Sequence, residues 1–409
     1  MNDPRRSLSR KLGEVVPIDI GTTSLTALRA ASRPGLSVPI MGHPVYNTLP
    51  LSAANVTKIG SDFQRVGFVW DRDPSRAEEW FDAYGVGWME TDGNMAPFRH
   101  PLETADWDAL SRHPRPAMPR RVQLADPASD AAVILDPPCP GLLDTCFMLR
   151  NGWQFMLDLT ENFRVANALL DWALETICQS YDLALSALPG DPEVIVYGDD
   201  LGFESGMYLS DLDFRTFIFP RMQTLFARIR ARSGAKLCLH SCGAVNSIVP
   251  DLCDLEVDML NLDFYARNML LPDIRAGLPK GMILHAPVNL AAIGQSVESG
   301  NGASLALLAT DVAIAMPCIA GPVDSISTPA EADQCIRGAA FVQALDGDDL
   351  RALRNLGPVK SIIRKAVDAA RAAEIPVFAS NDLLLGTLDR SQAGGNASAF
   401  QTLSPMTSN

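Results

Sequence analysis

The 409-residue chain contains no apolar run that approaches the roughly 20 residues of a membrane-spanning helix. Its basic start, with Arg5 and Arg6, is not followed by an apolar segment, so we expect no signal peptide. Positive charge is also scarce, since the formal net charge is −14. That balance argues against a general nucleic-acid or anionic-membrane surface, so we expect neither as a partner.

Several familiar motifs are missing as well. The phosphate loop Gly-x-x-x-x-Gly-Lys-Ser/Thr is absent, and no nucleophile elbow, EF-hand loop or basic aromatic patch stands out. The eight cysteines do not resemble a disulfide framework, because several fall inside apparent strands or helices. This pattern suits reduced thiols, and we predict a cytoplasmic enzyme.

The chain has an ordinary composition for a globular protein, with 47% hydrophobic and 20% charged residues. From residue 131 onward, short apolar runs alternate with helical patterns, which indicates βαβ units and a parallel sheet. The predicted strands are Ala131–Asp136, Glu193–Gly198, Lys236–His240, Asp258–Asp263, Gly281–Ala286 and Asp311–Met316. Two earlier strands, around Ile18 and over Asn55–Phe63, bring the number to eight. Eight parallel strands with intervening helices predict a (β/α)8 TIM barrel.

We expect one domain. The barrel is predicted over residues 1–385, with an irregular excursion over residues 66–130, before the third strand. Residues 386–409 are predicted to form a disordered tail, because the end of the chain is small and polar.

The stretch with the clearest chemistry is His240-Ser241-Cys242-Gly243, at the end of a predicted strand. Residues two apart on a strand point to the same side, so the imidazole and the thiol are expected together. Both are good ligands for Zn²⁺, and a catalytic zinc usually has three protein ligands. Cys318 is the predicted third ligand, because it follows the predicted last strand. In the alternative interpretation, His240 is only hydrogen-bonded and the cysteines act as small hydrophobic residues.

Other polar residues also lie at predicted strand ends. Asp199 and Asp200 follow one strand and could orient a substrate or act as acid or base, although either could instead cap a turn. Asp62 is a third candidate catalytic carboxylate. The predicted substrate-binding residues are Asn261, Asp263 and His285.

A series of segments occurs in a characteristic order and spacing: Arg150–Gly152, Met156–Leu159, Tyr197–Gly202, Phe214–Arg215, Phe219–Arg221, His240–Gly243, Ile248–Leu252, Val257–Asn261 and Thr328–Pro329. In this order and spacing, the chain resembles the uroporphyrinogen decarboxylase superfamily, most closely over residues 150–345. The fold of that superfamily is a TIM barrel, so the resemblance implies the same fold here.

Within the superfamily, the chain resembles the cobalamin-dependent methyltransferases, such as methylcobalamin:coenzyme M methyltransferases. That resemblance implies Zn²⁺ on His240, Cys242 and Cys318, and a methylcobalamin or corrinoid methyl carrier, possibly on a partner protein. The chain departs from the family in two places. Cys318 lies further from Thr328 than is usual, and Phe203 stands where the family has glutamine after Asp-Asp-Leu-Gly.

The sequence is compatible with three functions. The preferred prediction is a zinc-dependent methyltransferase acting between a corrinoid protein and a thiol or a methylated small molecule. The alternative is a carboxy-lyase of tetrapyrrole metabolism that uses Asp62. Gly21–Leu25 stands where true decarboxylases carry an arginine-rich motif, and a polyacidic substrate needs such fixed cations. The third function is that of a non-catalytic barrel subunit.

Overall fold

The computed structural model describes the segments that form the fold. These are residues 15–20, 22–23, 49–50, 60–69, 79–91, 94–119, 121–125, 127, 129–323, 326, 329–355, 357, 359–373 and 400–402. The predictions for residues 55–59, for Thr328 and for most of the tail lie outside these residues. Over the described part of the chain, no helix is both long enough and apolar enough to cross a membrane.

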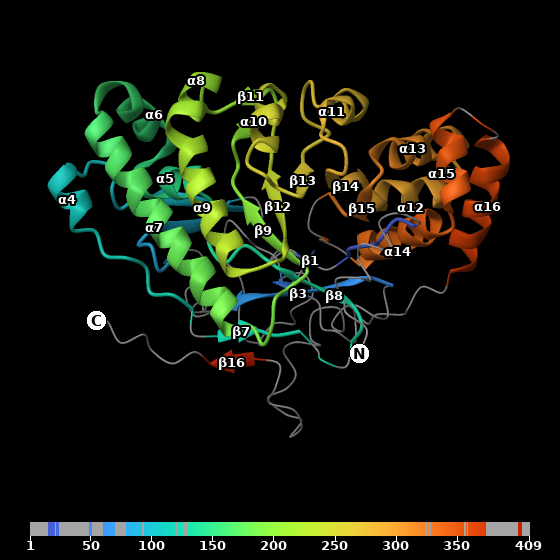
Figure 1. The fold of residues 1–409 in the computed structure, drawn as a ribbon, viewed down its shortest axis with the longest axis horizontal. Coiled ribbons are helices and arrows are strands. Elements are labelled where there is room, and N and C mark those ends of the chain that lie inside the picture. Colours follow the sequence, from blue (N-terminus) through green and yellow to red (C-terminus); the bar gives the residue numbers. More distant parts are fainter. Residues whose placement is uncertain are drawn as a thin grey trace.

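The described residues contain a curled parallel sheet of seven strands at the centre of the molecule (Figure 1). In chain order, its strands are β3 (Phe63–Val69), β8 (Ala132–Leu135), β9 (Val194–Gly198), β12 (Lys236–Ser241), β13 (Met259–Leu262), β14 (Ile283–Asn289) and β15 (Cys318–Gly321). Each strand pairs with the next one in this order. The predicted α/β class and five of the predicted strands, from Ala131–Asp136 to Gly281–Ala286, are confirmed.

Residues 15–20 lie between the two ends of this parallel sheet. The backbone N–H of Asp19 donates to the carbonyl of Ala320 on β15 at 2.8 Å, and Ala320 N–H donates to Pro17 at 2.9 Å. On the other side, Asp62 N–H donates to the carbonyl of Ile18 at 2.7 Å, directly before β3. This is the position of the eighth strand in the predicted barrel, and a closed eight-stranded barrel stays a prediction.

Helices pack around the outside of the sheet (Figure 1). The α-helices are α4 (Trp107–Ser111), α5 (Leu142–Arg150), α6 (Gly152–Glu161), α7 (Phe163–Ala187), α8 (Asp211–Asp213), α9 (Phe219–Arg232), α10 (Val249–Cys253), α11 (Leu271–Gly277), α12 (Leu290–Ser299), α13 (Gly302–Ala315), α14 (Pro329–Gln343), α15 (Gly347–Arg354) and α16 (Val359–Ala372). A π-helix, η1 (Phe214–Ile218), precedes α9, and a 3₁₀ turn, η2 (Asn246–Ile248), precedes α10.

The two faces of the parallel sheet carry separate hydrophobic clusters. This follows from the alternation of side chains along a strand. The large outer cluster packs between the sheet and the helices. The small inner cluster is formed by Phe63, Ala132, Ile134, Val194, Cys238, Met259, Ile283 and Ile319. The inner cluster therefore shows which residues of each strand face the interior of the curled sheet.

The excursion before the third predicted strand is more regular than predicted. It contains a three-stranded antiparallel sheet of β4 (Glu79–Phe81), β5 (Gly87–Thr91) and β6 (Asn94–Arg99). Outside the excursion, two short antiparallel pairings join β1 (Thr22–Thr23) to β2 (Leu49–Pro50), and β10 (Gly202–Phe203) to β11 (Gly206–Met207). The excursion over residues 66–130 has little apolar periodicity, so its strands were not predicted from the sequence.

Two strand predictions are corrected. The strand predicted over Asp311–Met316 is the end of helix α13, and the true strand starts at Cys318. A short apolar run without clear punctuation does not distinguish a buried strand from a buried helix. The second strand starts at Phe63, where the prediction had it end.

Near the end of the chain, β16 (Phe400–Thr402) pairs antiparallel with β7 (Arg121–Gln123), which in turn pairs with β3. Nothing in the local sequence indicates this strand, because its partner is far away along the chain. The rest of the predicted tail lies outside the described residues, and its disorder stays a prediction.

Candidate functional site

The candidate site lies where β9 and β12 end. His240 is the fifth residue of β12 and pairs in register with Gly198 on β9 and Asn261 on β13. Cys238, two residues earlier, belongs to the inner cluster, so His240 also faces the interior. Because Gly198 has no side chain, the imidazole has no side-chain neighbour from β9 on this row. Cys242 follows directly after the strand.

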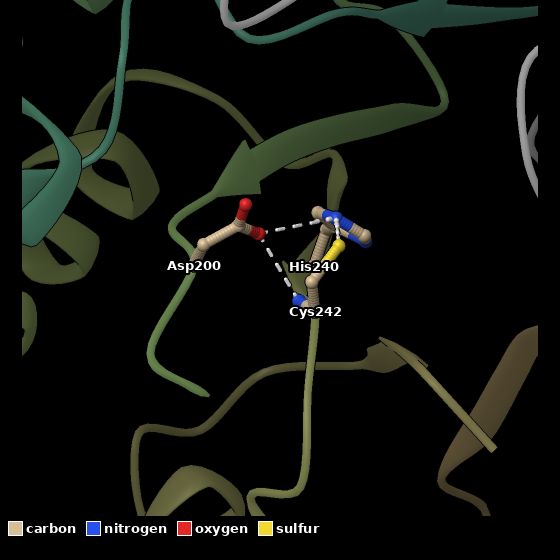
Figure 2. Close-up of side chains that lie close together, drawn as sticks. All are labelled: Asp200, His240 and Cys242. Carbon is tan, nitrogen blue, oxygen red and sulfur yellow. Dashed lines mark hydrogen bonds and ion pairs between the residues drawn. The ribbon is translucent and has the colours of Figure 1, made fainter. Parts of the chain in front are cut away.

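Asp200, His240 and Cys242 come together in one group, as predicted for two of them (Figure 2). Each offers one ligand atom, and these atoms all lie within 4.8 Å of one another. The Cys242 sulfur lies 3.4 Å from His240 Nε2, and His240 Nε2 lies 3.8 Å from Asp200 Oδ1. Among the described residues, this is the group of His, Cys, Asp and Glu side chains that could hold a metal ion.

The loops after β9 and β12 are held together by hydrogen bonds. Cys242 N–H donates to Asp200 Oδ1 at 3.2 Å, and the buried Ser241 hydroxyl accepts from Leu201 N–H at 3.1 Å. Gly243 has a φ of 83°, and a Cβ there would lie 2.2 Å from the Gly202 carbonyl carbon. Only glycine suits such a conformation and such an approach. The Gly after Cys242 therefore allows the two loops to meet.

The two adjacent aspartates have different surroundings. Asp199 is buried, and its carboxylate accepts from the N–H groups of Leu143 and Asp144 and from the Tyr197 hydroxyl at 2.8 Å. It thus stabilises the start of helix α5, which lies earlier in the chain, rather than capping the turn that follows Asp199. The side chain of Asp200 is 42% exposed and belongs to the candidate site.

Asp144, in the first turn of α5, was missed by sequence reasoning. Its carboxylate accepts from Asp200 N–H at 3.4 Å. Burial, followed by the nearby Asp199 and Asp200, raises the pKa of Asp144 well above its ordinary value. Burial likewise raises the pKa of Asp199 to about 6. An aspartate in the first turn of a helix is so common that the sequence carries no signal for this role.

The predicted substrate-binding residues have protein partners. His240 Nδ1 lies 2.7 Å from Asn261 Oδ1, and Asn261 Nδ2 contacts His285 Nδ1. His285 Nε2 lies 2.8 Å from Asp19 Oδ2. Asp263 accepts from Tyr265 N–H at 2.9 Å, which is a turn within the loop after β13. Asn261 and His285 therefore lie beside the site, and their side chains are hydrogen-bonded to one another, to His240 and to Asp19.

The row continues into a buried ion cluster that the sequence did not predict. Arg65 on β3 forms short ion pairs with both Asp19 and Asp136. Burial works against the charge of Asp19, but Arg65 and His285 outweigh it and hold the pKa of that carboxyl well below its ordinary value. Burial raises the pKa of Asp136 despite its contact with Arg65.

Cys318 is not brought to the site, which corrects the predicted ligand set. Ile319 belongs to the inner cluster, so its neighbour Cys318 faces the helices on the other side of β15. The Cys318 residue is 1% exposed, and its sulfur contacts the Val312 carbonyl and the Met316 sulfur. Burial raises the pKa of this thiol to about 12, which describes an inert core cysteine.

Asp62, which was predicted as a catalytic carboxylate at the end of a strand, lies before a strand instead. It precedes β3, at the amino end of the parallel strands, whereas Asp200 and Cys242 follow strands at their carboxyl ends. Its carboxylate accepts from Ile18 N–H at 2.9 Å. In α/β sheets of this kind, ligands bind at the carboxyl ends of the strands. The geometry therefore gives Asp62 a structural role at the end opposite to the site.

The donor set of the site fits a zinc ion. Imidazole nitrogen, thiolate sulfur and carboxylate oxygen are all zinc ligands, and ligand atoms around a tetrahedral zinc lie about 3.4 to 3.6 Å apart. The observed separations of 3.4 and 3.8 Å are close to these values. Partial burial, together with Asp200, raises the pKa of the Cys242 thiol above its ordinary value. The thiol by itself is therefore a poor nucleophile, and a bound cation would reverse that preference.

The fold and the site define the class of protein: an α/β enzyme-like scaffold with polar groups gathered at the carboxyl ends of a curled parallel sheet. The sequence pattern of the uroporphyrinogen decarboxylase (URO-D) family matches residues 146–269. This segment contains Asp199, Asp200, His240 and Cys242. The predicted resemblance to the uroporphyrinogen decarboxylase superfamily is confirmed.

A solved structure has a similar fold. It is a methyltransferase from Methanosarcina mazei, with a TM-score of 0.54 and 17% sequence identity, and the match covers 83% of this chain and 98% of that one. At this identity the likeness concerns the fold alone. No curated protein matches the chain in sequence.

Proposed function

We propose that the chain is a zinc-dependent methyltransferase that moves a methyl group between a corrinoid protein and a thiol or a methylated small molecule. One observation carries the proposal: Asp200, His240 and Cys242 bring three zinc-type ligand atoms within 4.8 Å of one another at the carboxyl ends of β9 and β12. The resemblance to the methyltransferase branch of the superfamily supports it. So does the fold shared with a protein named as a methyltransferase.

The proposed ligand set differs from the one predicted from sequence. Asp200 replaces Cys318 as the third ligand, which leaves a fourth position for the substrate. When bound, Zn²⁺ would stabilise a thiolate at neutral pH and so supply the nucleophile for methyl transfer.

Each side chain then has a distinct part in binding. His240 offers Nε2, because its Nδ1 is bonded to Asn261. Asp200 is oriented by the N–H of Cys242. The half-exposed positions of Asp200 and His240 keep the group open to a substrate. The corrinoid partner is proposed from the resemblance, and the cytoplasmic location is supported by eight free thiols.

The carboxy-lyase alternative gains little support from the geometry. A polyacidic tetrapyrrole needs fixed cations that are free to bind its carboxylates. Arg65 faces the interior of the sheet, but its guanidinium is already paired with Asp19 and Asp136. Asp62, the proposed catalytic carboxylate of that mechanism, lies at the opposite end of the strands. If the site binds no metal, a non-catalytic subunit becomes the favoured function.

The test is the metal content of the full chain, purified without a His-tag and then incubated with zinc and dialysed. We expect about one zinc per chain in the wild type, as for a three-ligand site, and a loss of zinc in Cys242→Ala and Asp200→Ala. Cys318→Ala is the matched control, because it removes a thiol of the same size from outside the group, and it should retain zinc.

Retention of zinc by Cys242→Ala, or its loss in Cys318→Ala, would contradict the proposed ligand set. A wild-type chain that holds no zinc would contradict the proposed function. If the pattern is as expected, methyl transfer from methylcobalamin to small thiols is the activity to measure next. The metal-free variants should then be inactive.

A further inference from the structure

A row of hydrogen-bonded side chains crosses the interior of the curled sheet and ends on His240. It runs from Asp19 through His285 on β14 and Asn261 on β13 to His240 on β12. His240 and Asn261 are direct partners in the register of β12 and β13. The row therefore follows one level of the sheet, and neighbouring strands supply neighbouring side chains.

The first member of the row has a defined role as a hydrogen-bond acceptor. Asp19 is 1% exposed and paired with Arg65, and an ionised carboxylate has no proton to donate. His285 Nε2, at 2.8 Å from Asp19 Oδ2, must therefore carry the proton and donate it. A neutral His285 then has only Nδ1 left, as an acceptor.

The next two bonds follow from the first. The amide nitrogen of Asn261 faces His285 Nδ1 and donates to it. The amide oxygen of Asn261 then faces His240 Nδ1 and can only accept. Hence the proton of His240 lies on Nδ1, and Nε2 keeps its lone pair. Nε2 is the atom that faces Cys242 and Asp200, at 3.4 and 3.8 Å.

We infer that Asn261, oriented by His285 and Asp19, is a positioning residue that holds His240 in the Nδ1–H tautomer, with Nε2 ready to bind a metal. The metal part of this inference rests on the proposed function, whereas the tautomer part does not. An imidazole can carry its proton on either nitrogen, and the hydrogen bond at one nitrogen decides the state of the other. Residues that orient ligands in this way commonly change metal affinity by about 10- to 100-fold when removed.

The buried cluster of Asp19, Arg65 and Asp136 holds the carboxylate at the start of the row in place. Asp19 would be a weak anchor for His285 if its own carboxylate could rotate or become protonated. Arg65 pairs with the same oxygen, Asp19 Oδ2, that His285 contacts. The cluster thus acts on His240 through two intermediate side chains and touches no ligand atom of the site.

The test uses ¹⁵N-histidine-labelled full-length protein, without metal, at about pH 8, above the ordinary pKa of histidine. The ¹⁵N chemical shifts of an imidazole report which nitrogen carries the proton. The chain has only five histidines, and the His240 signals are assigned by their loss in His240→Ala. We expect the wild-type His240 to carry its proton on Nδ1.

Two substitutions at Asn261 separate positioning from simple packing. Asn261→Leu fills the space but has no acceptor, so the His240 proton should move wholly or partly to Nε2. Asn261→Asp restores an acceptor and should restore the Nδ1–H tautomer. Zinc affinity should fall by about 10- to 100-fold in Asn261→Leu and recover in Asn261→Asp. Circular dichroism checks that both variants are folded.

A second pair tests the role of His285. His285→Leu removes the acceptor that orients the Asn261 amide, and should give a mixture of His240 tautomers. His285→Asn offers an amide oxygen near the position of Nδ1 and should keep the wild-type tautomer. Because Asn261 itself is unchanged in both proteins, a difference between them reports on amide orientation.

The inference is overturned if wild-type His240 carries its proton on Nε2, which would mean that the Asn261 amide is reversed. It is also overturned if Asn261→Leu keeps both the Nδ1–H tautomer and wild-type zinc affinity. A wild type that binds no zinc would remove the proposed function, but the tautomer spectra would still decide whether Asn261 positions His240. The two failures are therefore distinguishable.

Discussion

The buried ion cluster and the candidate metal site both contain charged and polar side chains, but they differ in exposure and in whether their charges are paired within the protein. Asp19, Arg65 and Asp136 have side chains that are between 1% and 14% exposed, and their charges pair with one another. The side chains of Asp200 and His240 are 42% and 31% exposed, so both can be reached from outside the protein. Charges in the first group determine stability, because nothing but the protein can compensate them. The ligand atoms of the second group remain open to a ligand.

The largest expected effect comes from breaking the buried cluster. Arg65→Leu leaves Asp19 and Asp136 buried without their cation, and removing one partner of a buried ion pair costs about 3–5 kcal/mol. We expect a loss of that order in the free energy of unfolding, measured by urea denaturation. Arg65→Lys keeps a charge at this position and should lose less. A stability unchanged by Arg65→Leu would mean that the cluster is not compact in solution.

The second prediction compares the adjacent aspartates. Asp199→Ala leaves buried N–H groups at the start of α5 and the Tyr197 hydroxyl without their acceptor, and unpaired buried donors cost about 1–3 kcal/mol. Asp200→Ala removes a half-exposed side chain and should change the unfolding free energy by no more than about 0.5 kcal/mol. Equal losses in the two variants would show that the structural and ligand roles are not separated.

The smallest effect concerns pH. The folded-state pKa values of Asp144 and Asp199 lie above their unfolded values, so the folded protein binds these protons more tightly. Their contribution to stability is greatest at low pH and is lost as the pH rises through the folded-state pKa. Asp19 has the opposite sign, since its pKa is lowered, and its contribution is complete above about pH 4.

The variant Asp144→Asn isolates this effect. As the pH rises above about 4, the ordinary pKa of an aspartate, the wild type should lose stability relative to Asp144→Asn, because the pKa of the Asp144 carboxyl is raised in the folded protein. Urea denaturation at several pH values measures the difference. A difference that is constant above this pH would show that Asp144 titrates normally in the folded protein.

Much of the fold could be predicted, because buried parallel strands have a local signature. The apolar runs that become β8, β9, β12, β13 and β14 are short and are separated by helical patterns. The failures occurred where that signature is ambiguous or absent. The alanine-rich run at the end of α13 fits a strand or a helix equally well. The three strands β4, β5 and β6 have little apolar alternation.

The candidate site was half predictable for the same reason. His240 and Cys242 are two residues apart at the end of a strand, so local geometry alone puts them on one side. Choosing between Asp199 and Asp200 needed the position of helix α5, which the sequence does not state. Placing Cys318 needed the true start of β15, since an error of one residue on a strand reverses the face.

The sequence by itself therefore determined the strand-and-helix pattern, the resemblance to the superfamily, and the pairing of an imidazole with a thiol. Only the tertiary structure decided which carboxylate joins them, and which side chains are hydrogen-bonded in the row that ends on His240. His285 and Asp19 are 266 residues apart and in contact. Periodicity and spacing describe neighbours along the chain, whereas the row that ends on His240 is built across strands, where neighbours are set by sheet register and closure rather than by sequence distance.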